Sequence, residues 1–459
     1  MIVISGGAVA TVDPAAREFA TGHVVVDGDL ITAVGPDEAP PSSTVPPPGA
    51  DRRVRRVDAT GCLVTPGLVN THHHLYQWAT RGYAQQEGLF GWLTTLYPVW
   101  AGIDEEVVGA AATAGLAWLA LSGCTTSTDH HYVFPRGTGD LFGATVAAAA
   151  EVGVRFHPAR GAIDLGASAG GLPPDDIVES TDGALAATQE AIDRYHDPAP
   201  GAMVRVAVAP CSPFSITPTL MRESVALGRA AGVRLHTHLA ETLDESDYCQ
   251  EHHGCDPVEY ADRLGFLGAD VWLAHGVHLS PGDVRRLGAT RTGVAHCPSS
   301  NARLGAGIAP VRALLDAGVP VGLGVDGAAS QEAGQLGAEL RQALYAARLR
   351  DGAAALTARD SLALGTIGGA RCLGRETEIG SLEPGKRADI AVWRLSGIGH
   401  AGIADPVAAL VFGPPATLEL LVVGGRPVVE RGRLLTADET NIARRLTTAS
   451  RRLAREAAP

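Results

Sequence analysis

The chain has 459 residues, of which 46% are hydrophobic and 19% charged, enough for one large α/β domain and a smaller one. A net charge of −13, without an arginine-dense tract, argues against nucleic acid as a partner. The absence of a long, charge-free apolar run argues against a membrane-spanning protein.

The N-terminus and the cysteines bear on the cellular compartment. The first residues, MIVISGGAVATVD, lack a basic region followed by a long apolar core, so we predict no signal peptide. Seven scattered cysteines indicate reduced thiols. Together these features predict a cytoplasmic protein.

Short strands are predicted at both ends of the chain. Residues 2–34 contain strand patterns and a hairpin with its turn at Gly28, followed by a proline-rich exposed connection over 36–53. After residue 376 strand patterns return, with a second hairpin at Gly424-Gly425, and a charged helix is predicted from Glu439 to Ala458. We expect residues 1–62 and 376–459 to form one small β-sandwich domain.

Between these ends, short apolar runs alternate with alanine- and leucine-rich helical segments. Eight such pairs in order predict a (β/α)8 TIM barrel over residues 63–375, with its active site at the carboxyl ends of the strands. The eight runs are Leu63–Val69, Thr125–Asp129, Arg155–Pro158, Val204–Ala209, Arg234–Leu239, Val271–His275, Gly293–Cys297 and Val321–Asp326.

Three histidines follow the first run in LVTPGLVNTHHHLYQ. Residues two apart in an extended chain point the same way, so His72 and His74 can reach one point while His73 turns away. Two imidazoles at a strand end are typical of a zinc site. Taken alone, the motif would more often be a solvated histidine run.

Further metal-type residues end other predicted strands. His236 and His238 share a face of the fifth run, with Glu241 just beyond it; the sixth run ends at His275 and the eighth at Asp326. Each alone has another reading: a core histidine, a turn or cap aspartate, or a solvated glutamate. Their joint occurrence at strand ends favours a functional site.

These motifs together resemble the amidohydrolase superfamily, in the branch of purine, pterin and triazine aminohydrolases. The resemblance rests on PGLVNTHHH, HLAE, AHGVH, HCPSSN, GVDGAAS and the C-terminal SLEPGKRADIAVW. It implies metal ligands His72, His74, His238 and Asp326. It also implies catalytic proton transfer by Glu241, His275 and Asp326.

The metal content follows from lysine usage. Binuclear members of this superfamily bridge two metals with a carboxylated lysine, whereas the sole lysine here, Lys386, lies in the C-terminal β region. We therefore expect one metal ion, Zn²⁺ with Fe²⁺ as the alternative. The metal would make hydroxide available at neutral pH to attack a ring carbon that bears an amine.

The substrate is predicted from the residues around the strand ends. Aromatic residues crowd the stretch after the first strand, among them Trp92, and suit a flat heterocycle or an aromatic core under a loop. Gln77 could pair with a purine amide edge. Arg160 could bind a ring carbonyl or form an ion pair, and His131 follows the second strand at the predicted mouth.

The segments LFGWLTTLYPVWA, STDHHYVFP, GGLPPDDIVES and APCSPFS resemble bacterial 8-oxoguanine deaminases, which implies conversion of 8-oxoguanine to urate and ammonia. Deaminases of guanine, isoguanine or cytosine and s-triazine chloro- or aminohydrolases are close alternatives. A cyclic amidase and a non-catalytic scaffold are the other classes considered. Self-association into a homo-oligomer is expected from exposed β edges and the C-terminal helix.

Overall fold

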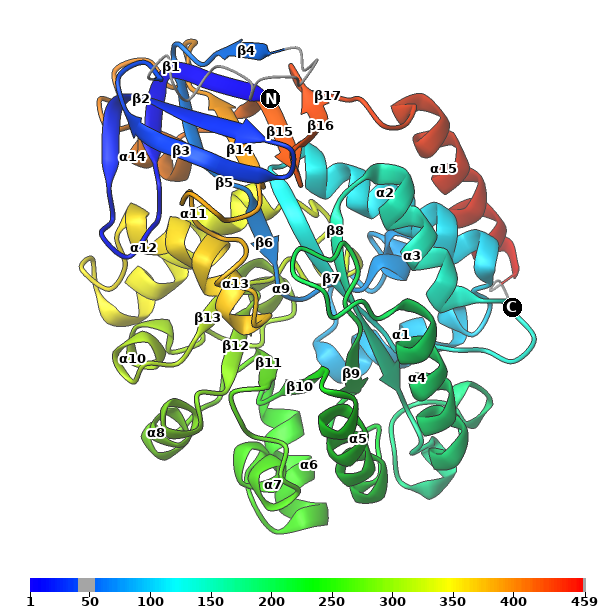
Figure 1. Ribbon diagram of the computed structural model, residues 1–459. Helices are drawn as coiled ribbons and strands as arrows, with labels where there is room; N and C mark the ends of the chain where they lie inside the picture. The colour runs from blue at the N-terminus through cyan, green and yellow to red at the C-terminus, as the bar shows by residue number, and fades with distance from the viewer. Residues whose placement is uncertain (40–53, 457–459) are drawn as a thin grey trace.

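Eight parallel strands close into a barrel at the centre of the computed structural model, which describes residues 1–39 and 54–456 (Figure 1). The predicted (β/α)8 barrel is confirmed, and neighbouring strands follow chain order around the ring. The strands are β6 (Leu68–Asn70), β7 (Cys124–His131), β8 (Arg155–Ala162), β9 (Ala207–Pro210), β10 (Arg234–Leu239), β11 (Val271–His275), β12 (Gly293–His296) and β13 (Val321–Leu323).

The first predicted strand is wrong in one respect, because the run Leu63–Val69 forms two strands. β5 (Cys62–Pro66) pairs with the terminal strands outside the barrel, and only β6 enters the ring. Gly67 separates them, and a Cβ there would lie 2.2 Å from the Thr125 side chain. The alternation of apolar and polar residues along a strand cannot reveal this change of sheet, because every residue of both strands is buried.

Helices follow the barrel strands as predicted. In α5, Thr217 caps the helix by accepting a hydrogen bond from Leu220 N, and Pro218 takes the first helical position. The helices of this part of the chain are α1 (Leu89–Trp100), α2 (Glu105–Leu121), α3 (Leu141–Val152), α4 (Thr181–Tyr195), α5 (Pro218–Ala231), α6 (Leu243–His253), α7 (Pro257–Arg263), α8 (Pro281–Thr290), α9 (Pro298–Arg303), α10 (Val311–Asp316), α11 (Leu336–Asp351), α12 (Ala358–Ala363) and α13 (Gly369–Cys372). A 3-10 helix, Leu75–Thr80, follows the three histidines.

The two ends of the chain build one sheet of nine strands beside the barrel (Figure 1). β14 joins the C-terminal strands to β5, and both predicted hairpins are present, with turns at Gly28 and at Gly424-Gly425. The remaining elements of this part are β1 (Ile2–Ala10), β2 (Glu18–Asp27), β3 (Leu30–Pro36), β4 (Arg55–Asp58), β14 (Ile390–Arg394), α14 (Pro406–Phe412), β15 (Thr417–Val423), β16 (Arg426–Glu430), β17 (Arg433–Leu434) and α15 (Glu439–Glu456).

The division of the chain into domains follows from this pairing. We propose that the N-terminal segment runs to Gly67 instead of residue 62, because β5 belongs to the sheet. Most of the predicted proline-rich connection, residues 40–53, lies outside the described residues.

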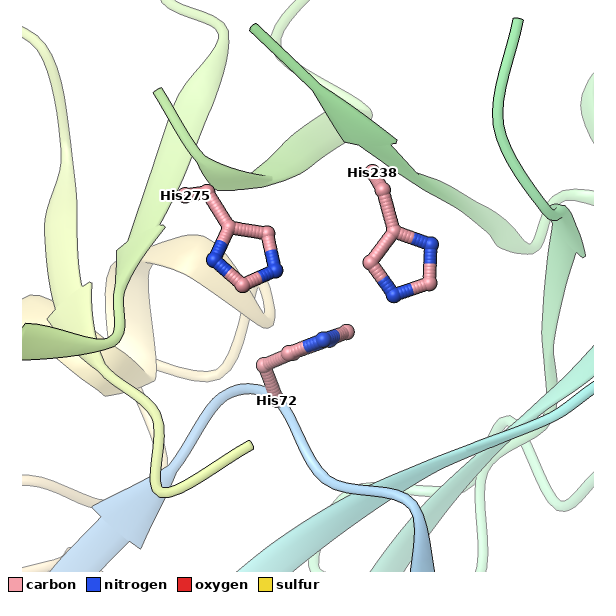
Figure 2. Close-up of side chains that lie close together, drawn as sticks. All are labelled: His72, His238 and His275. Carbon is pink, nitrogen blue, oxygen red and sulfur yellow. The ribbon is translucent and has the colours of Figure 1, made fainter. Parts of the chain in front are cut away.

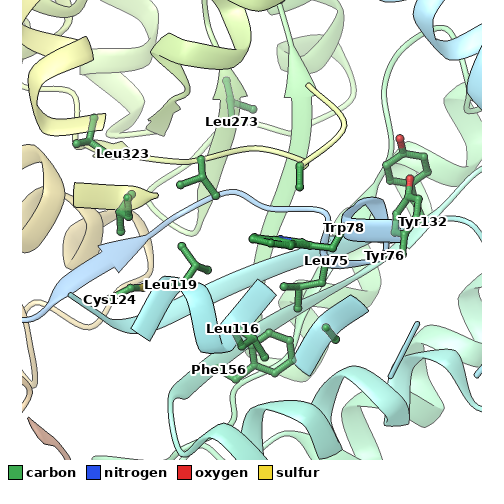
Figure 3. Close-up of a cluster of buried hydrophobic side chains, with 14 of the residues drawn as sticks. Leu75, Tyr76, Trp78, Leu116, Leu119, Cys124, Tyr132, Phe156, Leu273 and Leu323 are labelled. Atoms are coloured by element: carbon green, nitrogen blue, oxygen red, sulfur yellow. The ribbon is translucent and has the colours of Figure 1, made fainter. Parts of the chain in front are cut away.

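Three hydrophobic clusters hold the described residues together. Alternate residues of the sheet strands form one, a small one lies among the barrel strands and α13, and the largest packs the 3-10 helix Leu75–Thr80 and α2 against β7 and β8 (Figure 3). No helix among residues 1–39 and 54–456 combines the length and the apolar character that crossing a bilayer requires.

Candidate metal and catalytic site

Side chains from several strand ends of the barrel converge on one point, and Figure 2 shows three of them, His72, His238 and His275. His72 and His74 follow β6, His238 lies in β10, and Asp326 follows β13. Asp326 Oδ1 lies 3.3 Å from His72 Nε2 and 3.3 Å from His74 Nε2. His74 Nε2 lies 3.0 Å from His238 Nε2. The structure therefore brings all four predicted metal ligands together.

The tautomers of two of these imidazoles are fixed by backbone carbonyls. His74 Nδ1 lies 2.6 Å from the His130 carbonyl oxygen, and His238 Nδ1 lies 2.8 Å from the Cys211 carbonyl oxygen. A carbonyl only accepts, so each Nδ1 carries the proton and donates it. Each Nε2 consequently presents a lone pair to the other at 3.0 Å.

His72 adopts the same Nδ1–H tautomer because a second histidine accepts its proton in a hydrogen bond. His236 Nδ1 donates to the Trp272 carbonyl oxygen at 2.8 Å, which leaves His236 Nε2 as an acceptor. His72 Nδ1 lies 2.8 Å from that nitrogen and must donate to it. His72 Nε2 is buried without a hydrogen-bond partner among the described residues.

Three nitrogen lone pairs and one carboxylate oxygen thus face one another in a buried site. Burial lowers the pKa values of His72, His74 and His238, so the imidazoles are neutral, the form that binds metals. Facing lone pairs repel unless a cation lies between them. The donor set fits a metal ion, and outer hydrogen bonds that hold each Nδ1 are typical of metal-binding histidines.

Asp326 is oriented by hydroxyl groups that the sequence analysis did not single out as site residues. Ser300 Oγ donates to Asp326 Oδ2 at 2.6 Å, Ser330 Oγ lies 3.3 Å from the same oxygen, and Gly327 N donates to Oδ1 at 2.7 Å. Burial opposes ionisation of Asp326, and the hydrogen bonds from Ser300 Oγ and Gly327 N stabilise its carboxylate form.

Glu241 and His275 lie beside the ligands. His275 Nε2 is 3.5 Å from Glu241 Oε2 and 3.8 Å from Asp326 Oδ2, and its Nδ1 donates to Asn301 Oδ1 at 2.9 Å. Burial raises the pKa of Glu241 to about 7, with further contributions from Asp326 and Glu245 opposed by His275. The Glu241 carboxyl group can therefore exchange a proton near neutral pH.

The backbone is strained at three of these strand ends. Ala240, His275 and Asp326 have φ values of 55°, 74° and 63°, a left-handed conformation that non-glycine residues rarely adopt. Such residues cost about 1–3 kcal/mol each and persist where the surrounding structure enforces them. Here the turn at each strand end directs an acid or an imidazole into the site.

A cavity adjoins the metal ligands and Glu241. Its walls include His74, Gln77, Trp92, Tyr97, Tyr132, Ser212, Phe214, His238, Glu241, His275, Leu304, Asp326 and Ser330. Trp92 is fixed by donating from Nε1 to the Ala329 carbonyl oxygen at 3.1 Å. Aromatic walls beside a few polar groups suit a flat heterocycle.

Gln77 is the polar residue of this cavity without an internal role. It is fully buried, and neither its Oε1 nor its Nε2 has a hydrogen-bond partner within residues 1–39 and 54–456. A Cβ at position 327 would lie 1.7 Å from Gln77 Oε1, so Gly327 makes room for the amide. A buried amide left unpaired is costly, and a bound ligand would satisfy it.

Arg160 and His131 are not brought to the cavity. The Arg160 guanidinium forms a two-pronged ion pair with Glu179, at 2.7 and 2.8 Å, and covers the Phe134 ring at 3.9 Å. His131 Nε2 donates to the Val133 carbonyl oxygen, with its ring against Tyr76 and Phe134. Arg160 therefore forms an ion pair, which was the alternative to binding a ring carbonyl of the substrate.

Sequence reasoning assigned no orienting role to the residues that hold the site in place, namely His236, Ser300, Asn301 and Ser330. The first lies two residues before a ligand, and the next two lie in HCPSSN after the seventh strand. The position of HCPSSN at a strand end was the available signal. Which side chain each residue contacts depends on the closure of the barrel.

Comparison with known proteins agrees with this site. Residues 63–428 match the model of the amidohydrolase family, and the chain belongs to that family of enzymes. Among its relatives is the 8-oxoguanine deaminase of Pseudomonas aeruginosa, 45% identical over 410 residues that cover 89% of each chain. An isoxanthopterin deaminase from an unknown prokaryote is 39% identical, over 88% of this chain and 86% of the relative.

A solved structure extends the likeness to the whole fold. The atrazine chlorohydrolase of Arthrobacter aurescens TC1, in complex with zinc, superposes with a TM-score of 0.91 at 35% identity, over 98% of this chain and 100% of the other. The family and the histidine-rich centre together define a metal-dependent hydrolase.

Proposed function

We propose that this protein is a hydrolytic deaminase that converts 8-oxoguanine to urate and ammonia. The observation that carries the proposal is the convergence of three neutral imidazoles and Asp326 beside a proton-exchanging Glu241. The 45% identity to an 8-oxoguanine deaminase supports the substrate, as does the aromatic cavity with its unpaired Gln77 amide.

We further propose one Zn²⁺ per chain, held by His72, His74, His238 and Asp326. The sole lysine supports a single ion, because Lys386 Nζ donates to the Glu376 carbonyl oxygen and to Ser381, away from the barrel strand ends. When bound, such a metal lowers the pKa of water from about 15.7 towards about 7, which supplies hydroxide at neutral pH.

The remaining steps are proton transfers and charge stabilisation by the protein's own groups. Asp326 would accept the proton of the attacking water and pass it towards the departing amine. Glu241, with a pKa of about 7, would donate a proton to the adjacent ring nitrogen. His275, held by Asn301, would orient the water and stabilise developing negative charge through Nε2.

Gln77 would recognise one edge of the substrate ring through hydrogen bonds. Its amide offers donors and acceptors together, as the amide edge of an oxidised purine requires. Trp92, Tyr97 and Phe214 line the same cavity and would contact the ring faces. A pterin shares this edge chemistry, and the 39% identity to an isoxanthopterin deaminase makes isoxanthopterin the second candidate.

The test is metal analysis of the purified protein followed by a substrate panel. The panel contains 8-oxoguanine, isoxanthopterin, guanine, isoguanine, cytosine and a chlorotriazine, read by ammonia or chloride release. We expect one zinc per chain and the highest kcat/KM for 8-oxoguanine. A higher value for another compound would overturn the substrate, whereas no hydrolysis of any compound by the metal-loaded protein would overturn the deaminase function.

Cytoplasmic location and self-association stay predictions. Cell fractionation would check the first. Light scattering after gel filtration would check the second, with a dimer or larger assembly expected.

A further inference from the structure

A second polar cavity lies at the opposite end of the barrel from the metal ligands. It has a volume of about 250 Å³ and is lined by residues at the amino ends of β8, β9 and β10 and by the loop after α13. Pro198 and Gly232 at its rim are exposed, so the cavity opens to solvent. The lining residues are His157, His196, Pro198, Arg205, Val206, Gly232, Val233, Arg234, Leu373 and Gly374.

Arginine side chains gather around this cavity, in a chain whose net charge is −13. Arg205 and Arg375 share a single carboxylate, that of Glu378, at 2.6 and 3.0 Å. Arg234 packs against Gly374 and forms no ion pair within the described parts of the chain, and neighbouring Asp270 is held by Arg229 at 2.8 Å. Glu378 is thus shared by two guanidinium groups, while Arg234 has only the more distant carboxylates of Glu376 and Asp270 near it within the described residues.

Several N–H donors around this cavity have no internal acceptor. Arg375 is fully buried, and its Nε and Nη1 lack hydrogen-bond partners among the described residues. The same holds for Arg205 Nε, Arg234 Nε and His157 Nδ1, and His157 is only 2% exposed. Buried charged donors left unpaired are among the costlier defects in a folded protein.

The electrostatics agree with this geometry. Burial, together with the neighbouring Arg155 and Arg205 and against the opposing effect of Glu378, lowers the pKa of Arg375 to about 10. Burial likewise lowers the pKa of His157 well below its usual value, with Arg375, Arg234 and Arg205 acting in the same direction. An anion would relieve this mutual repulsion and accept the free hydrogen bonds.

We propose that this cavity, which we call the basal cavity, binds a small tetrahedral oxyanion of the phosphate or sulfate class. Arg205, Arg234 and His157 would donate to it directly, and Arg375, which shares Glu378 with Arg205, would add positive charge nearby. An oxyanion would supply the acceptors that these donors lack. The basal cavity is separate from the active site, because barrel strands carry their catalytic groups at the other end.

The experiment is calorimetric titration of the metal-loaded protein with inorganic phosphate and, separately, sulfate, at constant ionic strength. We expect one equivalent to bind with a Kd in the micromolar to low millimolar range and to raise the unfolding midpoint. Arg234→Gln should weaken this binding at least about tenfold, as loss of a charge-assisted hydrogen bond predicts. Arg234→Lys should retain part of it. Arg312→Gln, which alters an exposed arginine on α10, should leave it unchanged.

A second variant distinguishes loss of binding at the basal cavity from loss of structure and from phosphate binding at the active-site metal. His157→Gln should also weaken the binding, and circular dichroism would verify that each variant is folded. Phosphate held at the active-site metal would be insensitive to both substitutions. Absence of binding by the wild-type protein, or binding by both Arg234→Gln and His157→Gln as tight as that of the wild type, would overturn the proposal.

Discussion

Proton positions on individual side chains decide what this site can do. Backbone carbonyls fix His74 and His238 as Nδ1–H tautomers, and His236 does the same for His72. The lone pairs that remain define the metal position, and the acid beside them carries a proton near neutral pH. Three predictions belong to this scale.

Glu241→Gln tests the proton shuttle. The amide keeps the size of the side chain but cannot exchange a proton, so kcat should fall by about two to four orders of magnitude while the zinc content stays at one per chain. Turnover assays and metal analysis on the same preparation would check this. Full activity of the variant would remove Glu241 from the mechanism.

His236→Leu tests the relay behind His72. Loss of the acceptor for His72 Nδ1 should free the ring to adopt the other tautomer, and metal affinity should fall about 10- to 100-fold. Competition with a chelator would measure the change. Restoration of activity by excess zinc would separate this effect from unfolding, and an unchanged affinity would contradict the relay.

Gln77→Leu tests substrate recognition. The substitution removes hydrogen bonds to the ring without touching a metal ligand, so kcat/KM should fall at least about tenfold with zinc content unchanged. Gln85→Leu is the matched control, because Gln85 is exposed and its amide donates to the neighbouring Gly82 carbonyl oxygen. Equal kinetics for the two variants would show that Gln77 does not contact the substrate.

At the scale of elements, the connection from β12 through α9 to α11 supports the site from behind. Glu339 of α11 accepts hydrogen bonds from Gln331 Nε2 at 2.6 Å and Ser299 N at 3.2 Å, and so joins the loops that carry Ser300 and Ser330. Burial raises the pKa of Glu339 to about 7. The folded state therefore favours its protonated form.

This shift predicts a pH-dependent stability. A carboxyl group with a raised folded-state pKa stabilises the fold below its unfolded pKa of 4.5, and this contribution is lost as the pH rises through about 7. Glu339→Gln has no such group, so its stability relative to wild type should increase between pH 5 and 8, by up to about 3 kcal/mol. Denaturant unfolding at several pH values would measure it, and parallel profiles would refute it.

At the scale of the whole molecule, one buried ion pair ties the barrel to the terminal sheet. Arg155 at the start of β8 bonds through Nε and Nη2 to both oxygens of Asp389, each at 3.0 Å, and Asp389 also accepts from Gly424 N in the β15–β16 turn. Their side chains are 1% and 2% exposed. This buried ion pair fixes the position of the barrel relative to the terminal sheet.

Arg155→Met should destabilise the protein by about 3–5 kcal/mol, because it leaves Asp389 buried without its partner. Arg155→Met combined with Asp389→Asn should recover part of this loss. Arg312→Met, which breaks an exposed pair, should cost less than about 1 kcal/mol. Chemical denaturation of the three variants would measure these differences, and equal costs for the buried and exposed pairs would contradict the role of Arg155.

The sequence by itself determined the alternation of strands and helices, the barrel and which strand ends carry the metal-type residues, since these depend on local periodicity and on spacing along one strand. It could not place the end of the sheet at Gly67, because β5 and β6 are equally buried and a change of partner strand leaves no periodic trace.

Tertiary structure alone decided which polar side chains face the cavity. Gln77 and Trp92 line it, whereas Arg160 turns to Glu179 and His131 packs among aromatic rings, although all four were predicted from proximity to strand ends. The contacts of His236, Ser300 and Asn301 likewise join residues up to 164 positions apart. Such contacts form only when the ring of strands closes, because side-chain direction and partner choice depend on neighbours distant in the chain.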